Sequence, residues 1–319
     1  MNKFLIKTII SLLILVVVIL LLLLGIPKDH NHFLCEYDHK VALFQETPQP
    51  RIILMGGSSI PYGVDTKLLI DSLRCNVVNF GLYGGIGIRL PMEDGLRYVK
   101  KGDLVVVQME YHNFFNGGNG GDIAFIAFMV STDWKYLGRL NMAQAWNVIR
   151  GAPQMAIGNL KRLASYPWTG YMDTPVENPK YEYTQSGFNA YGDEVSHYRY
   201  PNDTSDLEDL ASGVDFRKET VIPEFVDWLG KTLHRYEAAG ARVIMVPPVC
   251  VETFFEYVYN PRIAEELHRV GYDFVVEPAF MVQPDSCEFN TGYHMNKTGT
   301  ERNTLRMMEI LKKELATVK

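Results

Sequence analysis

The hydrophobic pattern of the chain changes character after its first segment. Thr8 to Ile26 is almost wholly apolar and carries no charge. At about 1.5 Å per residue, a helix of this length reaches roughly 28 Å, close to the hydrocarbon thickness of a bilayer. We therefore expect a short tail over 1–7 and a single transmembrane signal anchor over 8–27.

The charges that flank the apolar segment predict its orientation. Lys3 and Lys7 precede it, whereas Lys28 and Asp29 roughly cancel after it. The positive-inside tendency then leaves the N-terminus in the cytoplasm and places the rest of the chain in the periplasm or at the cell surface. A cleaved signal peptide is the alternative, but the apolar run is longer than an ordinary signal core and its exit lacks an A-x-A-like site, which favours an uncleaved anchor.

From Arg51 onward, short apolar runs alternate with segments of helical periodicity. The strands expected are Ile52 to Met55, Val77 to Phe80, Leu104 to Met109, Val243 to Val246 and Phe274 to Val276. The helices expected are Asp65 to Leu73, Leu90 to Lys100, Pro223 to Ala239, Pro261 to Val270 and Thr298 to Leu315. This alternation predicts an α/β domain over 49–319 with a mostly parallel central sheet, joined to the anchor by a linker over 28–48.

The alternation breaks over about 115–215, where a glycine-rich run precedes an apolar stretch and then a segment rich in Tyr, Trp and Pro. So long a connection is uncommon without a function, so we expect a partly helical cap insertion over the carboxyl edge of the sheet. Its apolar stretch, Ile123 to Val130, lies between Asp122 and Asp133 and is too short for a second crossing. Membrane contact at this stretch is the alternative.

Composition argues against nucleic acid as a partner and leaves open whether the cysteines form disulfides. The net charge is −6 and no basic stripe is present, which argues against nucleic acid. The four cysteines fit no metal-binding spacing, and they are equally explained as small buried residues or as one or two disulfides. Histidines near Cys35, at positions 30, 32 and 39, fit a polar linker better than a metal site. We expect no metal and no cofactor.

The first candidate for chemistry is Ser58, which follows Gly56 and Gly57 at the end of an expected strand. In open α/β sheets, reactive groups lie at the carboxyl ends of strands, and a helix N-terminus begins close by near Asp65. A hydroxyl in this place suits an acyl-transfer nucleophile. An ordinary strand-to-helix turn is the alternative, and Ser59 is an alternative nucleophile one position later.

Two further strand ends offer hydrogen-bond donors. The segment Asn79 to Gly85 is rich in glycine, and its backbone amides are candidates to hold an oxyanion or, alternatively, to form a tight turn. The segment Glu110 to Phe114 offers His112 or Asn113, although an Asn at a strand end is commonly a turn residue.

A fourth loop, Phe289 to Gly299, leads into the last expected helix and contains His294. A histidine late in the chain, after an early serine, can lie over Ser58 as a general base and later return the proton to the leaving group.

In order and in strand-end context, these four segments resemble the SGNH (GDSL-like) hydrolases, above all their membrane-anchored extracytoplasmic branch related to teichoic-acid D-alanylation and alginate O-acetylation proteins. Gly57-Ser58 resembles the nucleophile block, Asn79 to Gly84 the glycine block, Tyr111 to Asn113 a degenerate third block, and His294 with Asn296 and Gly299 the last. The resemblance covers Arg51 to Arg302, and the insertion only loosely. It implies a three-layer, flavodoxin-like sandwich.

The resemblance assigns roles position by position. Ser58 becomes the nucleophile, His294 the base, and Gly84 with His112 or Asn113 the oxyanion donors beside the Ser58 amide. In the family an Asp lies three or four residues before the His, whereas this chain has Thr291 and Asn290 there. Three alternatives are open. Asn290 orients His294, a carboxylate from Asp285 or Glu288 does so, or the protein has lost catalysis.

Asp193 and His197 form a second polar cluster inside the insertion. They fit a surface turn with a solvated His, or a rim that contacts sugar. Neighbouring aromatic residues support the rim, because aromatic faces pack on sugar C–H faces. These residues are Tyr181, Tyr183, Phe188, Tyr198 and Tyr200.

Together these features predict a membrane-anchored extracytoplasmic serine esterase or O-acyltransferase. It would act on acyl groups, above all acetyl, of envelope or exported polysaccharide through an acyl-serine intermediate. The expected partners are an acylated glycan or another ester substrate, the membrane, and a membrane-bound O-acyltransferase. The alternative is a catalytically inactive SGNH-like glycan-binding or scaffold protein partnering such an acyltransferase.

Overall fold

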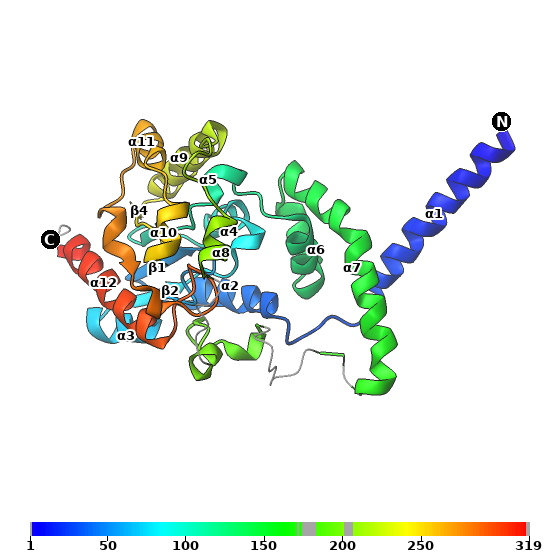
Figure 1. Cartoon of the computed structure of the whole chain (residues 1–319), viewed down its shortest axis with the longest axis horizontal. Helices are drawn as coiled ribbons and strands as arrows, with labels where there is room; N and C mark the ends of the chain where they lie inside the picture. Colours follow the sequence, from blue (N-terminus) through cyan, green and yellow to red (C-terminus); the bar gives the residue numbers. More distant parts are fainter. Residues whose placement is uncertain (1, 171, 174–182, 201–206, 317–319) are drawn as a thin grey trace. The chain divides into compact units, whose positions relative to one another are not determined.

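The computed structural model describes residues 2–170, 172–173, 183–200 and 207–316 (Figure 1). The chain divides into two compact units. The anchor unit comprises Met1–Cys35 and Gly121–Gln185, and the sheet unit comprises Glu36–Gly120 and Ser186–Lys319. The cap insertion predicted over 115–215 is therefore divided, because its part from Ser186 onward belongs to the sheet unit.

The sheet unit contains a four-stranded parallel sheet with the strand order β2-β1-β3-β4. The strands are β1 Arg51–Gly56, β2 Asn76–Asn79, β3 Leu104–Gln108 and β4 Arg242–Met245. Four of the five expected strands are present, which confirms the α/β class with a mostly parallel sheet. The fifth, Phe274 to Val276, contributes only one parallel bridge, from Phe274 to Met245. A separate pair consists of β5 Cys250–Val251 and β6 Val282–Gln283.

Helices pack on both faces of the sheet, because strand residues are apolar on both sides. On one face, Ile52, Leu54 and Val106 pack with Met307 of the last helix in a continuous core. On the other, the hydroxyl of Tyr236 contacts Met55 and donates to the Met92 carbonyl. The helices of this unit are α2 Glu36–Glu46, α3 Thr66–Leu73, α4 Arg89–Gly95, α5 Asn113–Asn116, α8 Leu207–Ser212, α9 Pro223–Ala238, α10 Glu252–Val258, α11 Arg262–Arg269 and α12 Lys297–Ala316.

The second half of the predicted linker 28–48 is a helix, α2, and this corrects the sequence prediction. Tyr37, Lys40 and Phe44 are buried along it. The hydropathy of α2 is close to neutral, since its buried face includes the charged Lys40, so the sequence pattern resembled a solvated segment. The buried Nζ of Lys40 donates to the side-chain and backbone oxygens of Asn79, at 3.2 Å each.

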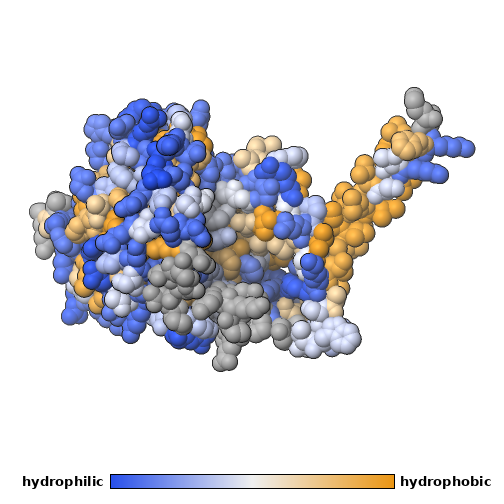
Figure 2. Space-filling view, in the orientation of Figure 1, coloured by the Kyte–Doolittle hydropathy of each residue, from blue (hydrophilic) through white to orange (hydrophobic). Residues whose placement is uncertain are grey.

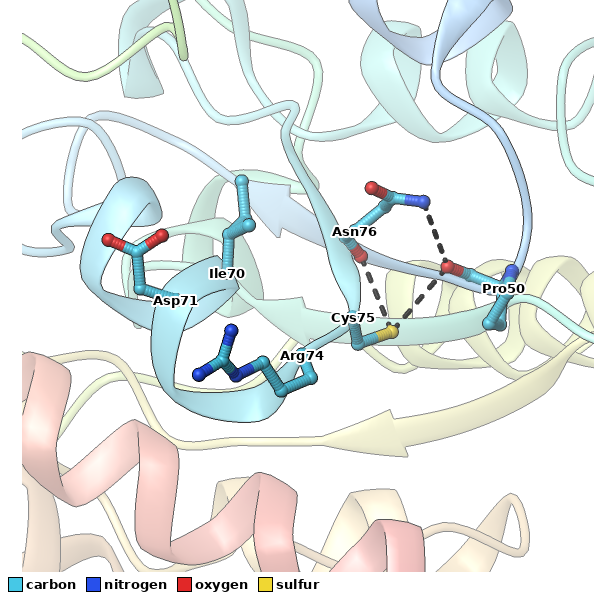
Figure 3. A pocket seen from close by; sticks show the side chains of 6 residues that line it. All are labelled: Pro50, Ile70, Asp71, Arg74, Cys75 and Asn76. Atoms are coloured by element: carbon cyan, nitrogen blue, oxygen red, sulfur yellow. Dashed lines mark hydrogen bonds between the residues drawn. The ribbon is translucent and has the colours of Figure 1, made fainter.

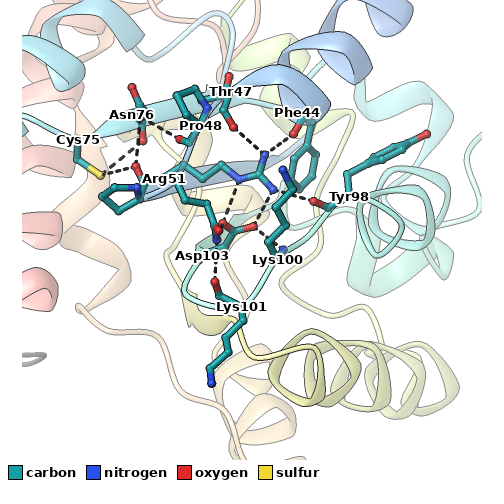
Figure 4. A network of polar contacts seen from close by, with 12 residues as sticks. Phe44, Thr47, Pro48, Arg51, Cys75, Asn76, Tyr98, Lys100, Lys101 and Asp103 are labelled. Carbon is teal, nitrogen blue, oxygen red and sulfur yellow. Dashed lines mark hydrogen bonds and ion pairs between the residues drawn. The ribbon is translucent and has the colours of Figure 1, made fainter.

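A buried ion pair joins the amino ends of β1 and β3 (Figure 4). The guanidinium of Arg51 donates to both carboxylate oxygens of Asp103, each at 3.0 Å. It also donates to the backbone carbonyls of Thr47, at 3.2 Å, and Tyr98, at 2.7 Å. Both side chains of the pair are fully buried, and this network joins β1 to the start of β3 at the edge opposite to Ser58.

The anchor unit contains α1 Asn2–Leu24, α6 Asp122–Ser131 and α7 Met142–Thr169. Among the described residues, one helix, Lys3–Leu24, is long and apolar enough to span a membrane. Figure 2 shows its surface as a continuous apolar band. The apolar stretch predicted to be too short for a second crossing is the helix α6, whose side chains are largely buried and which packs against α7.

Candidate active site

Ser58 lies two residues after the end of β1, in a turn that leads into α3. Its carbonyl accepts a hydrogen bond from the Tyr62 N–H at 3.1 Å, and α3 begins after Asp65, whose side chain caps the Leu68 N–H at 2.8 Å. Ser58 is half-buried, and within the described residues its hydroxyl makes no hydrogen bond. Ser59, by contrast, is fully buried. Only the first of the two serines is accessible to a substrate.

Tyr62 joins the Ser58 turn to the loop that carries His294. Its ring stacks on the imidazole of His294, with the centroids 4.1 Å apart and an interplanar angle of 13°. Its carbonyl accepts the Met295 N–H at 3.1 Å, directly after the histidine. Two segments that are distant in the sequence are thereby held together at the carboxyl end of β1.

The surroundings of His294 keep its ring neutral. Burial, followed by the neighbouring charge of His197, lowers the pKa of His294 to about 3. Its Nδ1 lies 2.9 Å from Oδ1 of Asn290. Because that amide oxygen only accepts, Nδ1 carries the proton and the lone pair belongs to Nε2. A neutral imidazole with its lone pair on Nε2 is the form that a general base requires.

Of the three proposed orienters of His294, which are Asn290, Asp285 and Glu288, the structure pairs Asn290 with Nδ1 of the ring. Asp285 binds elsewhere, because its carboxylate accepts the N–H of Thr253 at 2.9 Å and the hydroxyl of the same residue at 2.6 Å. Asn290 fixes the orientation of the imidazole, but it supplies no negative charge to stabilise an imidazolium.

The glycine segment and the third segment also meet. Gly84 begins a short 3-10 helix, and a Cβ placed on it would lie 3.0 Å from Cε1 of His112. Asn113 is buried, and its side-chain amide donates to the Glu110 carbonyl at 3.0 Å. Of the two candidates for an oxyanion donor, His112 is therefore the one that borders Gly84. The roles of these donors and of the Ser58 amide stay predictions.

Glu110 is a central residue that sequence reasoning missed. Its carboxylate is buried, Oε1 accepts the Ser59 N–H at 2.9 Å, and Oε2 has no partner among the described residues. A Cβ on Gly57 would lie only 2.2 Å from Oε2, so a glycine is needed there. The signal was present, because Glu110 follows β3 at the same sheet edge, but the neighbouring His and Asn were preferred as donors.

The Asp193 and His197 cluster is buried, which corrects both sequence interpretations of it, the solvated turn and the sugar-contacting rim. The His197 ring lies against the Glu194 carboxylate through Nδ1 and 2.9 Å from the Met295 carbonyl through Nε2. Asp193 accepts from the Thr66 N–H at 3.0 Å and from Nδ2 of Asn79 at 2.8 Å. These contacts therefore hold the loops behind the site together.

The residues of the predicted aromatic rim are divided between the two units. Tyr183 belongs to the anchor unit, whereas Phe188, Tyr198 and Tyr200 belong to the sheet unit. Phe188 and Tyr198 are half-buried, and the Lys40 ammonium lies 5.6 Å from the centroid of the Phe188 ring. Tyr181 lies outside the described residues. Phe188 thus serves packing around Lys40.

A cavity of about 290 Å³ lies at the amino edge of the sheet, between α3 and the starts of β1 and β2 (Figure 3). Its walls include Asp71, Arg74 and Asn76. Because it opens at the edge opposite to Ser58, it is unsuited to serve the candidate active site. The half-buried Cys75 in its wall has a pKa raised by burial, which keeps its thiol protonated and unreactive.

All four cysteines lie in the described part of the chain, and none forms a disulfide there. Cys250 and Cys287 are buried, and burial raises the pKa of the Cys250 thiol. Of the two sequence alternatives, small buried residues or bridges, the structure favours the first for this pair.

Comparison with models of known protein families found no match, and comparison with curated protein sequences found none either.

Proposed function

We propose that this protein is a membrane-anchored serine esterase or O-acyltransferase with an SGNH-like fold. α1 is the anchor, the sheet unit lies outside the cytoplasmic membrane, and Ser58 is the nucleophile. The observation that carries the proposal is the Tyr62 junction, which holds the turn of an accessible, unbonded serine against the loop of a neutral histidine. Both lie at the sheet edge where α/β folds place reactive groups.

The reaction follows the acyl-serine route. Oγ of Ser58 attacks the ester carbonyl while its proton passes to Nε2 of His294, and the tetrahedral oxyanion is held by backbone N–H groups of Ser58 and Gly84 and by His112. The C–O bond to the leaving alcohol then breaks, and His294 returns the proton to that alcohol. Water or a sugar hydroxyl attacks the acyl-serine through the same base, which gives hydrolysis or transfer.

The substrate class in this proposal is an acylated envelope or exported polysaccharide. The support is the outward-facing placement predicted from the flanking charges and the resemblance of the four segments to acyl-transfer proteins of the cell envelope. The same placement makes a membrane-bound O-acyltransferase a natural acyl donor or partner.

A second candidate function is an inactive relative that binds a glycan or assembles with an acyltransferase. The observation that favours it is Asn290, because an imidazolium without a carboxylate partner is poorly stabilised in a buried site. The two candidates share the fold and differ only in whether Ser58 becomes acylated.

Covalent labelling distinguishes the two candidates. We expect a fluorophosphonate probe to label the full-length protein in detergent at Ser58, as located by peptide mass spectrometry, because only an activated serine attacks this reagent quickly. Ser58→Ala should lose the label. A folded wild-type protein that stays unlabelled under conditions that label a reference serine esterase would support the inactive candidate instead.

Asn290→Asp should restore the missing charge. A carboxylate at Nδ1 stabilises the imidazolium formed during attack, so we expect the pKa of His294 to rise and the rate of p-nitrophenyl acetate turnover to increase about tenfold or more. In the wild type, with a His294 pKa of about 3, the rate should not fall between pH 7 and pH 5. In the variant, an acid limb should appear in this window.

Thr291→Asp is the matched control for Asn290→Asp. It adds the same charge one residue away, but the Thr291 side-chain oxygen faces the Tyr293 N–H rather than His294 Nδ1. We expect it to change the rate less than Asn290→Asp does. Equal effects of the two substitutions would mean that Asn290 does not orient the base.

A further inference from the structure

The long helix α7 has two apolar faces, and only one of them is used inside the anchor unit. The buried face contains Val148, Gly151 and Ala156. Gly151 packs closely, because a Cβ there would lie 2.4 Å from the Asp122 carbonyl at the start of α6. This face accounts for the packing of α7 on α6 and α1.

The opposite face of α7 carries large apolar side chains that are exposed. They lie three, four or eight residues apart along the helix, and these spacings put them on a single helix face. They are Met142, Trp146, Ile149, Ile157, Leu160 and Trp168. Trp168 and Met142 are each 87% exposed, so neither packs on the described part of the chain. So much exposed apolar area on one helix marks an interaction surface.

The position of α7 on α1 indicates what covers this face. α7 meets α1 only near the end of the apolar helix, where Nδ2 of Asn159 donates to the Leu22 carbonyl at 3.0 Å. Arg162 donates to the Pro27 carbonyl, just beyond α1, at 3.1 Å. Leu23 is buried there, whereas the earlier turns of α1 are exposed. α7 therefore crosses α1 at the level where a membrane span would end (Figure 1).

The composition of the exposed face fits this level of a bilayer. Tryptophans stand near both ends of α7, and Arg150 and Lys161 lie on its exposed surface, beside the apolar face. Tryptophan prefers the membrane interface, and basic side chains can extend from such a helix to lipid headgroups while their stems cover apolar surface.

We propose that the exposed face of α7 lies in the headgroup region of the leaflet in which α1 ends, as an interfacial membrane helix. This rests on the proposed anchor role of α1 but not on any catalytic role of Ser58. The ligand is the lipid surface itself. In this position, α7 would attach the anchor unit to the bilayer surface, in addition to the attachment that α1 provides by spanning the membrane.

The test is tryptophan quenching by brominated lipid. The full-length protein is placed in vesicles of phosphatidylcholine and phosphatidylglycerol, with bromine near the headgroup end or near the middle of the acyl chains. We expect Trp146 and Trp168 to be quenched, more strongly by the shallow bromines. Trp146→Phe with Trp168→Phe should therefore remove most of the quenched amplitude. Trp228→Phe, in α9 of the sheet unit, is the control and should leave it unchanged.

The outcomes separate this proposal from the others. A chain that stays with the vesicles through a sodium carbonate wash but shows no quenching at Trp146 and Trp168 overturns the interfacial helix while leaving α1 as an anchor. That outcome would direct attention to a protein partner for the same face. A chain that leaves the vesicles in the wash overturns both the anchor and the interfacial helix. Neither result depends on labelling of Ser58.

Discussion

Ser58→Ala is expected to lower kcat/KM for p-nitrophenyl acetate by about 10³- to 10⁶-fold, because the variant lacks the nucleophile and the neighbouring Ser59 hydroxyl is fully buried. The turn itself should persist, since its hydrogen bond uses the Ser58 carbonyl and the Tyr62 N–H, not the side chain. Far-ultraviolet circular dichroism and the melting temperature should match those of the wild type. The rate should be measured on full-length protein in detergent.

Ser59→Ala is the matched control for the loss of Ser58. Ser59 is fully buried, its hydroxyl has no partner among the described residues, and its N–H already donates to Glu110. Removing that hydroxyl should therefore leave kcat/KM close to the wild-type value. If Ser59→Ala were the inactive variant and Ser58→Ala retained turnover, the nucleophile assignment would be wrong and the turn would have to open during catalysis.

The sequence predicted those parts of the site that depend on strand ends. Ser58 and His112 follow buried apolar strands, and apolar runs define where a parallel strand stops. The His294 loop was recognised by its position before the last helix. Because parallel strands end at one edge of a sheet, the sequence predicts that Ser58 and His112 lie at the same edge. Patterns of this kind involve only residues close together in the sequence, so they can be recognised without knowledge of tertiary contacts.

The parts that the sequence did not predict are those decided by tertiary contacts. Asp285 does not orient His294, because its carboxylate binds Thr253 instead. No rule based on sequence spacing predicts this contact. The burial of His197 depends on Glu194 and on a backbone carbonyl from the distant His294 loop. Lys40 was assigned to a linker because its compensating oxygens come from Asn79 and Gly192, far away in the chain.

The structure also changes how Glu110 is understood chemically. Its carboxylate accepts the Ser59 N–H and so fixes the backbone that carries Ser58. Glu110 is therefore a positioning residue in the proposed mechanism. Gly57 permits its approach, which explains why a glycine stands between β1 and the serine.

Asp103→Ala should cause the largest loss of stability among these substitutions. It leaves the fully buried Arg51 guanidinium without its carboxylate, and breaking a buried pair in this way costs about 3–5 kcal/mol. The melting temperature of the full-length protein in detergent should fall by roughly 10 °C. Asp103→Asn keeps an oxygen acceptor for the guanidinium but not the charge. Its melting temperature should therefore lie between those of the wild type and Asp103→Ala.

The exposed pair of Arg235 and Glu93 provides the control, because the two side chains are 54% and 37% exposed. Glu93→Ala should cost less than about 1 kcal/mol, since solvent screens this pair. A similar small cost for Asp103→Ala would show that water reaches Arg51 and that the amino ends of β1 and β3 are not held by this network. The expected large difference would instead mean that β1 is clamped at its amino end. The position of Ser58 at its carboxyl end would then depend on a charge pair at the opposite edge of the sheet.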